Sequence, residues 1–351
     1  MKKHMIFAAL ALAAFVSCQR AETPKVDTND GVSPVAMTLK ASIGGADTKI
    51  AYVDEENVLK SSWEQFDKVS VISLDISGNV LTNDVFTATS VSADGKLAEF
   101  EGEVSNHESA KSMYVYYPAL TDGDGSDENP WRVPKVYENA AEGVLDGVKK
   151  GQTYLTFNDD VVQQSIADPT SHLEQYTVFS GKAEMEEGEL LVELEHRSYL
   201  MKVQLTLPES GLTVNSLQIY VKSEDGTYDR HVTGSGWTDV YEVGSFPGGY
   251  NSYYSIKFGT DYVDSGTGLL VEGTTLTAYI VAYAGASYDF AKGETTDYYL
   301  TAGDYFSFEL YTNENATGTY LWTLDKLTVP KDIVFENGKM YRVSATLEAA
   351  N

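Results

Sequence analysis

The chain has 351 residues and a formal net charge of −27 at pH 7. Such an excess of carboxylates repels nucleic acid and anionic membrane surfaces, so the sequence excludes both as binding partners. A single cysteine excludes an intramolecular disulfide, and the stability of the fold has to come from a hydrophobic core.

The N-terminal residues are typical of a secretory signal. A short basic segment precedes an apolar run over residues 6–16, and Cys18 follows directly after a serine. This order predicts a signal peptide over residues 1–17. The position of Cys18 resembles a lipobox, whose cysteine carries acyl chains such as palmitate, and Gln19 behind it resembles lipoproteins of the outer membrane. We therefore predict lipidation at Cys18, with residues 18–34 as a flexible tether.

Apolar and polar residues alternate along most of the remaining chain. The clearest runs cover residues 201–207, 217–222 and 341–347, and further candidates are 68–76, 276–283 and 306–312. A period of two predicts half-buried strands of antiparallel sheets, with one face on a core and the other in water. Short helical patterns occur at 139–148 and 160–167.

These patterns predict an all-β protein made of two tandem antiparallel β-sandwich domains. One set of strands ends near residue 195 and a new strand begins shortly after residue 198. We therefore place an N-terminal domain over residues 35–195 and a C-terminal domain over residues 196–351.

Catalytic motifs are not found in a matching context. The sequence has no nucleophile elbow, zinc-protease, P-loop or dinucleotide-binding pattern where the neighbouring elements would fit it. The sequence therefore predicts no enzyme and no cofactor.

One acidic segment has the composition of a calcium-binding loop. Asp122, Asp124 and Asp127 offer hard oxygen ligands between glycines, although the order departs from that of an EF-hand. A solvated acidic loop explains the same residues, and we predict no metal there.

Two tryptophans are candidates for contact with a glycan. Trp131 and Trp237 lie in polar segments that contain glycine or proline, where an exposed ring would stack on a sugar. Aromatic residues of β-sandwiches also serve as core residues or cross-strand pairs, and this alternative stays open.

Several phrases of the sequence, taken in order, resemble one family. They are residues 48–52, Trp63, 66–71, 100–102, 114–118, 194–198 and 335–343. Their order is similar to that of the fimbrillin-like lipoproteins, the subunits of type V pili in Bacteroidales. The resemblance covers roughly residues 40–350 and implies two tandem transthyretin-like sandwich domains.

The resemblance also implies a mechanism of assembly. In that family a protease cuts the lipidated precursor after a basic residue, the first strand leaves, and a strand of the neighbouring subunit replaces it. Here residues 35–43 would be the removed strand and Lys49 the processing site. The implied partners are other pilus subunits, the outer membrane through the lipid, and a host protein or glycan.

Two functions from different classes follow. The first is a surface-exposed pilus or adhesion subunit of the outer membrane that assembles by donor-strand exchange. Only four residues follow the alternating run that ends at residue 347, so we expect the chain to accept a strand without donating one, as a tip subunit would. The alternative is a free-standing outer-membrane lipoprotein that binds a glycan.

Overall fold

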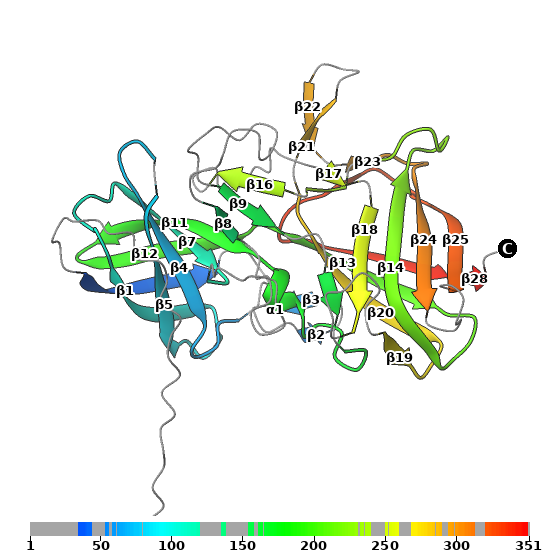
Figure 1. Cartoon of the computed structure of the whole chain (residues 1–351), viewed down its shortest axis with the longest axis horizontal. Coiled ribbons are helices and arrows are strands. Elements are labelled where there is room, and N and C mark those ends of the chain that lie inside the picture. The colour runs from blue at the N-terminus through cyan, green and yellow to red at the C-terminus, as the bar shows by residue number, and fades with distance from the viewer. Residues whose placement is uncertain are drawn as a thin grey trace, which may run out of the picture. The chain divides into compact units, whose positions relative to one another are not determined.

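The computed structural model describes residues 34–43, 53–55, 58–60, 62–78, 80–119, 135–137, 154–157, 161–163, 165–230, 232–234, 236–239, 250–251, 253–259, 268–284, 286–289, 294–297, 299–312 and 320–349. The chain divides into two units, residues 1–32 and 33–351, and all described residues belong to the second. Their regular structure is almost entirely β, with a single four-residue helix, α1 (Leu173–Tyr176) (Figure 1). The all-β prediction is therefore confirmed.

Seven strands close into a barrel in the order β1-β12-β11-β7-β4-β5-β6. Their bounds are β1 (Val35–Ile43), β4 (Lys68–Leu74), β5 (Val80–Val91), β6 (Leu97–Val104), β7 (Ser112–Tyr117), β11 (Phe179–Glu186) and β12 (Glu189–His196). The inward side chains form one buried cluster. Within it, Trp63 packs edge-on against Phe100 and Tyr117, with ring centroids 5.0 and 5.4 Å away. Edge-to-face packing of this kind stabilises the core beyond the contribution from burying the rings.

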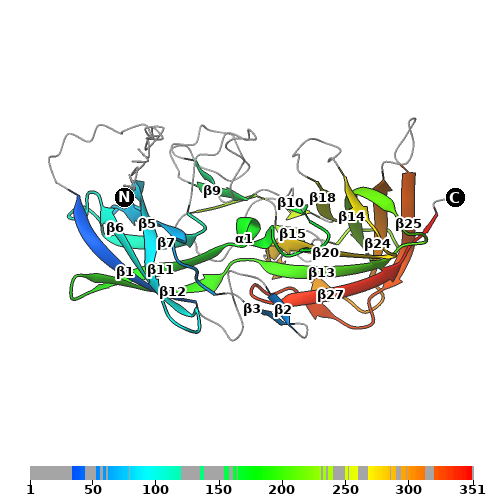
Figure 2. The same cartoon turned by 90° about the horizontal axis from the view of Figure 1, so that it is seen from below.

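The C-terminal strands form a large and a small sheet. The large sheet has the order β10-β18-β14-β24-β25-β28 with β19 beside β14, and the small sheet has the order β20-β13-β27 (Figures 1 and 2). The large sheet comprises β10 (Val161–Gln163), β14 (Leu212–Lys222), β18 (Tyr253–Phe258), β19 (Leu269–Val271), β24 (Tyr305–Thr312), β25 (Tyr320–Thr328) and β28 (Glu348–Ala349). The small sheet comprises β13 (Tyr199–Thr206), β20 (Thr275–Ala282) and β27 (Met340–Thr346). Apolar side chains of both sheets belong to one core cluster.

The remaining strands make short, separate pairings. They are β2 (Val53–Glu55) with β3 (Val58–Lys60); β8 (Lys135–Tyr137) with β9 (Tyr154–Phe157) and β16 (Gly236–Asp239); β15 (Thr233–Gly234) with β17 (Tyr250–Asn251); β21 (Ala286–Asp289) with β22 (Glu294–Asp297); and β23 (Tyr299–Leu300) with β26 (Ile333–Val334).

The pairing is not purely antiparallel, which corrects the prediction from sequence. β1 runs parallel to β12, β10 to β18 and β13 to β27. Parallel neighbours cannot be joined by a tight turn and are brought together by long connections. The alternation of apolar and polar residues does not reveal such pairs, because the pattern is the same whether a strand runs parallel or antiparallel to its neighbour. Residues 161–163 of the predicted helical pattern are also in a strand, β10.

β12 ends at His196 and β13 begins at Tyr199, so only two residues separate the barrel from the small sheet. The imidazole of His196 packs on the ring of Phe179, with ring centroids 3.9 Å apart. This packing gives the histidine in the phrase at 194–198 a structural role at the end of the barrel. The division into two domains at residue 195 remains a prediction.

Candidate functional site

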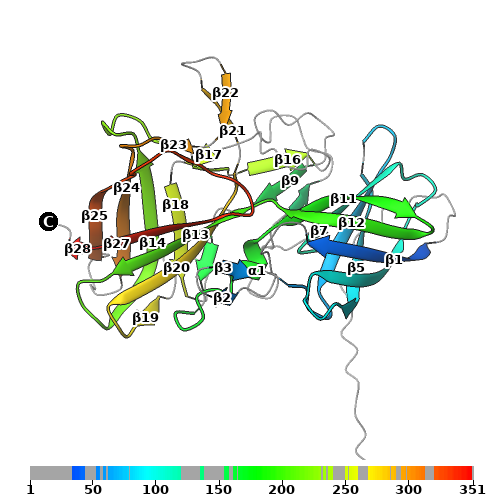
Figure 3. The ribbon, with the colours of Figure 1, turned by 180° about the vertical axis from the view of Figure 1, so that it is seen from behind.

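β1 is the strand that closes the barrel. It pairs antiparallel with β6 over eight residues, from Val35↔Val104 to Ser42↔Leu97, and parallel with β12 over five, from Leu39↔Leu190 to Ile43↔Leu194 (Figure 3). Its neighbours are distant in the sequence, so no hairpin ties β1 to either of them. The predicted strand over 35–43 and β1 coincide.

The inward face of β1 is apolar. Leu39, Ala41 and Ile43 are 0, 1 and 6% exposed and belong to the core cluster of the barrel. Full burial of one aliphatic side chain of this size contributes about 2 kcal/mol. A barrel without β1 would therefore expose a groove of apolar side chains between β6 and β12, together with two rows of unpaired backbone groups.

The outward face of β1 carries one charge, that of Lys40. Its Nζ donates a hydrogen bond to Glu189 Oε2 of β12 at 2.6 Å, and Glu99 lies opposite it on β6. The hydrogen bond and charge of Glu189, with a smaller effect of Glu99, raise the pKa of Lys40 above its ordinary value. β1 is thus paired by its backbone, its apolar face and one cross-strand ion pair.

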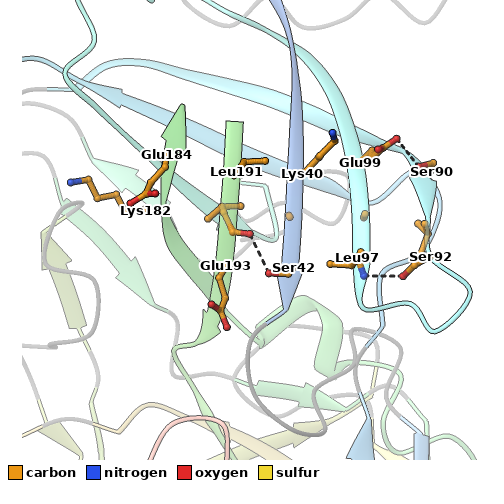
Figure 4. Close-up of a pocket in the computed structure, with 14 residues that line it drawn as sticks. Lys40, Ser42, Ser90, Ser92, Leu97, Glu99, Lys182, Glu184, Leu191 and Glu193 are labelled. Atoms are coloured by element: carbon orange, nitrogen blue, oxygen red, sulfur yellow. Dashed lines mark hydrogen bonds between the residues drawn. The ribbon is translucent and has the colours of Figure 1, made fainter. Parts of the chain in front are cut away.

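A hollow of about 780 Å³ lies over the outward face of β1 and its neighbours (Figure 4). Lys40 and Ser42 of β1 lie between Glu99 and Leu97 on one side and Leu191 and Glu193 on the other. The Ser42 hydroxyl lies 3.5 Å from the Val192 carbonyl oxygen, which is the limit of hydrogen-bond distance. A small side chain at position 42 therefore leaves the space beside Glu193 unfilled.

Most of the sequence-predicted site residues fall outside the described part of the chain. These are Cys18, Lys49, Asp122, Asp124, Asp127 and Trp131. Trp237 lies in β16, where its backbone is opposite Thr156 of β9, but its side chain is outside the described residues. Lipidation, processing, calcium binding and glycan contact at these residues stay predictions.

Two kinds of feature are absent from the described residues. Among them, no group of three or more acidic, histidine or cysteine residues is placed to hold a metal ion. In the same part of the chain, no helix has the length and apolar character to cross a membrane.

Sequence reasoning missed the charged side chains around β1. Lys40 is 59 residues from Glu99 and 149 from Glu189, and only the closed barrel brings the three together. A signal was present, because glutamates recur at alternate positions of residues 99–103 and 193–195. Such a period places the carboxylates on one face of each strand.

Comparison with known proteins gave structural similarities only. No protein-family model matches the chain, and no match was found among curated proteins. A candidate cell adhesion protein from Bacteroides ovatus is similar at 14% identity and a TM-score of 0.40, covering 91% of this chain and 97% of that one. A candidate adhesin from the same species is similar at 10% identity and a TM-score of 0.37, covering 83 and 78%. The fimbrial anchor protein of Porphyromonas gingivalis is similar at 12% identity and a TM-score of 0.32, covering 84 and 82%.

Proposed function

We propose that this chain is a fimbrillin-like cell-surface subunit of a pilus or adhesion structure, in which β1 is removed and a strand of a neighbouring subunit takes its place. The observation that carries the proposal is the position of β1. The strand completes the barrel between β6 and β12 without a hairpin to either, so its loss would leave the hairpins β5–β6 and β11–β12 intact. The family resemblance of the sequence agrees with this role.

The physical basis is strand addition. An opened slot presents unpaired donors and acceptors on two strand edges and an apolar floor where Leu39, Ala41 and Ile43 had been. An extended strand from another chain restores the backbone ladder, and its alternate side chains fill the floor. The role requires assembly and contact, and no catalysis.

We further propose that the chain accepts a strand but does not lend β27, which suits a subunit at a pilus tip. β27 is paired with β13 over seven residues. Val343 and Ala345 of β27 and the following Leu347 are 8, 8 and 1% exposed. Releasing β27 would expose these side chains and leave one edge of β13, the central strand of the small sheet, unpaired.

The proposed architecture is two tandem transthyretin-like sandwich domains, 35–195 and 196–351, with the barrel as the sandwich that β1 closes. The proposed location is the outer-membrane surface, with Cys18 as the lipidated residue and residues 18–34 as the tether.

Limited proteolysis tests the proposal. Trypsin should cut the native chain first after Lys49, and Lys49→Gln should abolish that cut. The trimmed chain, mixed with a polymerising pilus subunit, should then form complexes that resist SDS without heating. Cleavage elsewhere, or a trimmed chain that forms no such complex, would contradict the proposal. Retention of the uncut monomer on a polysaccharide column would favour the glycan-binding alternative.

A further inference from the structure

The walls of the β1 slot are acidic on their outward side. Three glutamates of β6 and three of β12 occupy the positions that alternate with the buried residues: Glu99, Glu101, Glu103, Glu189, Glu193 and Glu195. β1 offers one positive charge to them, Lys40. Each wall therefore carries more negative charge than the resident strand neutralises.

The resident strand shows how the slot accommodates a cation. The Lys40 ammonium group reaches Glu189 at 2.6 Å, while Glu99 lies directly across on the other wall. Glu195 has a basic partner of its own, Arg197 at 3.2 Å. Among the residues that the structure describes, no ion pair is found for the outward carboxylates of Glu101, Glu103 or Glu193.

Two outward positions of β1 face two of these carboxylates with short neutral side chains. Thr38 lies opposite Glu101 of β6, and Ser42 lies opposite Glu193 of β12. The hollow of about 780 Å³ extends over Ser42 and includes Glu193 in its lining (Figure 4). A longer side chain at position 42 would therefore have both space and a carboxylate partner.

We infer that the strand that replaces β1 is basic on its outward face, with lysine or arginine at the place of Lys40 and at the places of Thr38 and Ser42. The inference rests on the proposed strand replacement and names the chemistry of its partner. Cations beside the wall carboxylates gain Coulomb energy over short distances, whereas an acidic strand meets like charges on both sides. The single positive charge of β1 then compensates only part of the negative charge of the slot, which favours replacement of β1 by a more basic strand.

The test uses the full chain with a site for a sequence-specific protease inserted between Ile43 and Val53. After the cut, fluorescent peptides of residues 35–43 compete for the slot. One peptide has the native sequence and a second carries Lys40→Glu. A third carries Thr38→Lys with Ser42→Lys, and its control carries Thr38→Gln with Ser42→Gln, which matches length without charge.

At low ionic strength the Lys40→Glu peptide should bind about tenfold more weakly than the native peptide. The doubly basic peptide should bind about fivefold more tightly than its glutamine control. Both differences should shrink in about 1 M salt, where screening acts over a few ångströms. Equal binding of all four peptides would overturn the charge inference and leave strand replacement standing.

If no peptide enters the slot, the proposed function fails, and the inference about the replacing strand fails with it. If peptides enter, the uncut chain gives a second test of whether the slot favours cations on its outward side. There, Lys40→Glu should accelerate hydrogen exchange of the β1 amides, and a second change, Glu189→Lys, should restore most of the protection. Ser42→Lys should slow the exchange, and Glu193→Gln should remove that effect. If Glu189→Lys does not restore the protection and Glu193→Gln does not remove the effect of Ser42→Lys, the inference is overturned.

Discussion

At the scale of single residues, His172 makes the stability of the fold depend on pH. Its ring is buried, with Nε2 2.8 Å from the Tyr279 carbonyl oxygen and with no partner found for Nδ1 in the described structure. Burial lowers the pKa of His172 to about 4, against the opposing effect of the Tyr279 carbonyl. In the unfolded chain the pKa of histidine is about 6.5.

The sign of the effect follows from these two pKa values. Between pH 6.5 and 4 the unfolded chain binds a proton at His172 that the folded chain does not, so stability falls as the pH falls through this window. The loss attributable to His172 is roughly 3 kcal/mol. Urea unfolding at pH 7 and pH 4 should show a smaller loss for His172→Gln than for the native chain. The control variant His107→Gln changes a half-buried histidine. If His172→Gln loses as much stability between pH 7 and pH 4 as this control, His172 is not the source of the pH dependence.

Asp304 carries a buried negative charge that pairs with the partly exposed guanidinium of Arg230. Its carboxylate is 0% exposed and lies 2.9 Å from Arg230 Nε and 3.0 Å from Nη2, while the Thr301 backbone N–H donates to it at 2.8 Å. Asp304→Asn keeps the shape but leaves the guanidinium without its charge partner, which should cost about 3 kcal/mol. Thermal unfolding checks this value. The control Asp229→Asn removes an exposed pair with Lys222 and should cost much less; equal losses would contradict the account.

At the scale of elements, alternation predicted the strands with one wet face. In β14 and β27 buried residues alternate with more exposed ones along residues 217–222 and 342–347, as the sequence indicated. β4 differs, because Val69 and Val71 face the barrel core while Ile72 and Leu74 belong to the second core cluster. A strand that is buried on both faces has no simple alternation of polar and apolar residues. The contact of β4 with the second core cluster was therefore not predictable from the sequence.

The slot around β1 shows that local sequence patterns are also limited in predicting a functional site. The sequence predicted the strand over 35–43, and the structure adds its parallel pairing with β12 and the contact of Lys40 with Glu189. Register between elements about 150 residues apart depends on how the whole barrel closes, and a local pattern does not contain that information. α1 was also missed, since four residues are too few to show a helical period.

Leu39 tests how strongly β1 is held by its apolar face. Leu39→Ala leaves a cavity in the core of the barrel and should cost about 3 kcal/mol. The loss should be concentrated in β1, so its amides should exchange hydrogen faster while those of β14 keep their protection. The outward control Thr38→Ala should change little. Uniform loss of protection across both core clusters would show that β1 does not detach as a separate element.

At the scale of the whole molecule, the predicted lipid at Cys18 determines where the protein resides. Two or three acyl chains anchor a protein almost permanently, whereas one chain alone binds a membrane weakly. Cys18→Ala should therefore move the protein from the membrane fraction to the soluble fraction. Fractionation after alkaline washing measures this, with Ser17→Ala as the neighbouring control. A Cys18→Ala variant that still sediments with the outer membrane would refute the lipid anchor.

The central claim is that β1 is a replaceable part of a barrel that otherwise persists. It is tested most directly by cutting the chain between Ile43 and Val53 and adding an isotope-labelled peptide of residues 35–43 without denaturant. Native mass spectrometry then counts the heavy strands bound per chain, and hydrogen exchange follows the hairpins β5–β6 and β11–β12. The account predicts one heavy strand per chain, bound in place of the light one while both hairpins stay protected. A light strand that is never displaced, or displacement only with loss of protection in both hairpins, would contradict it.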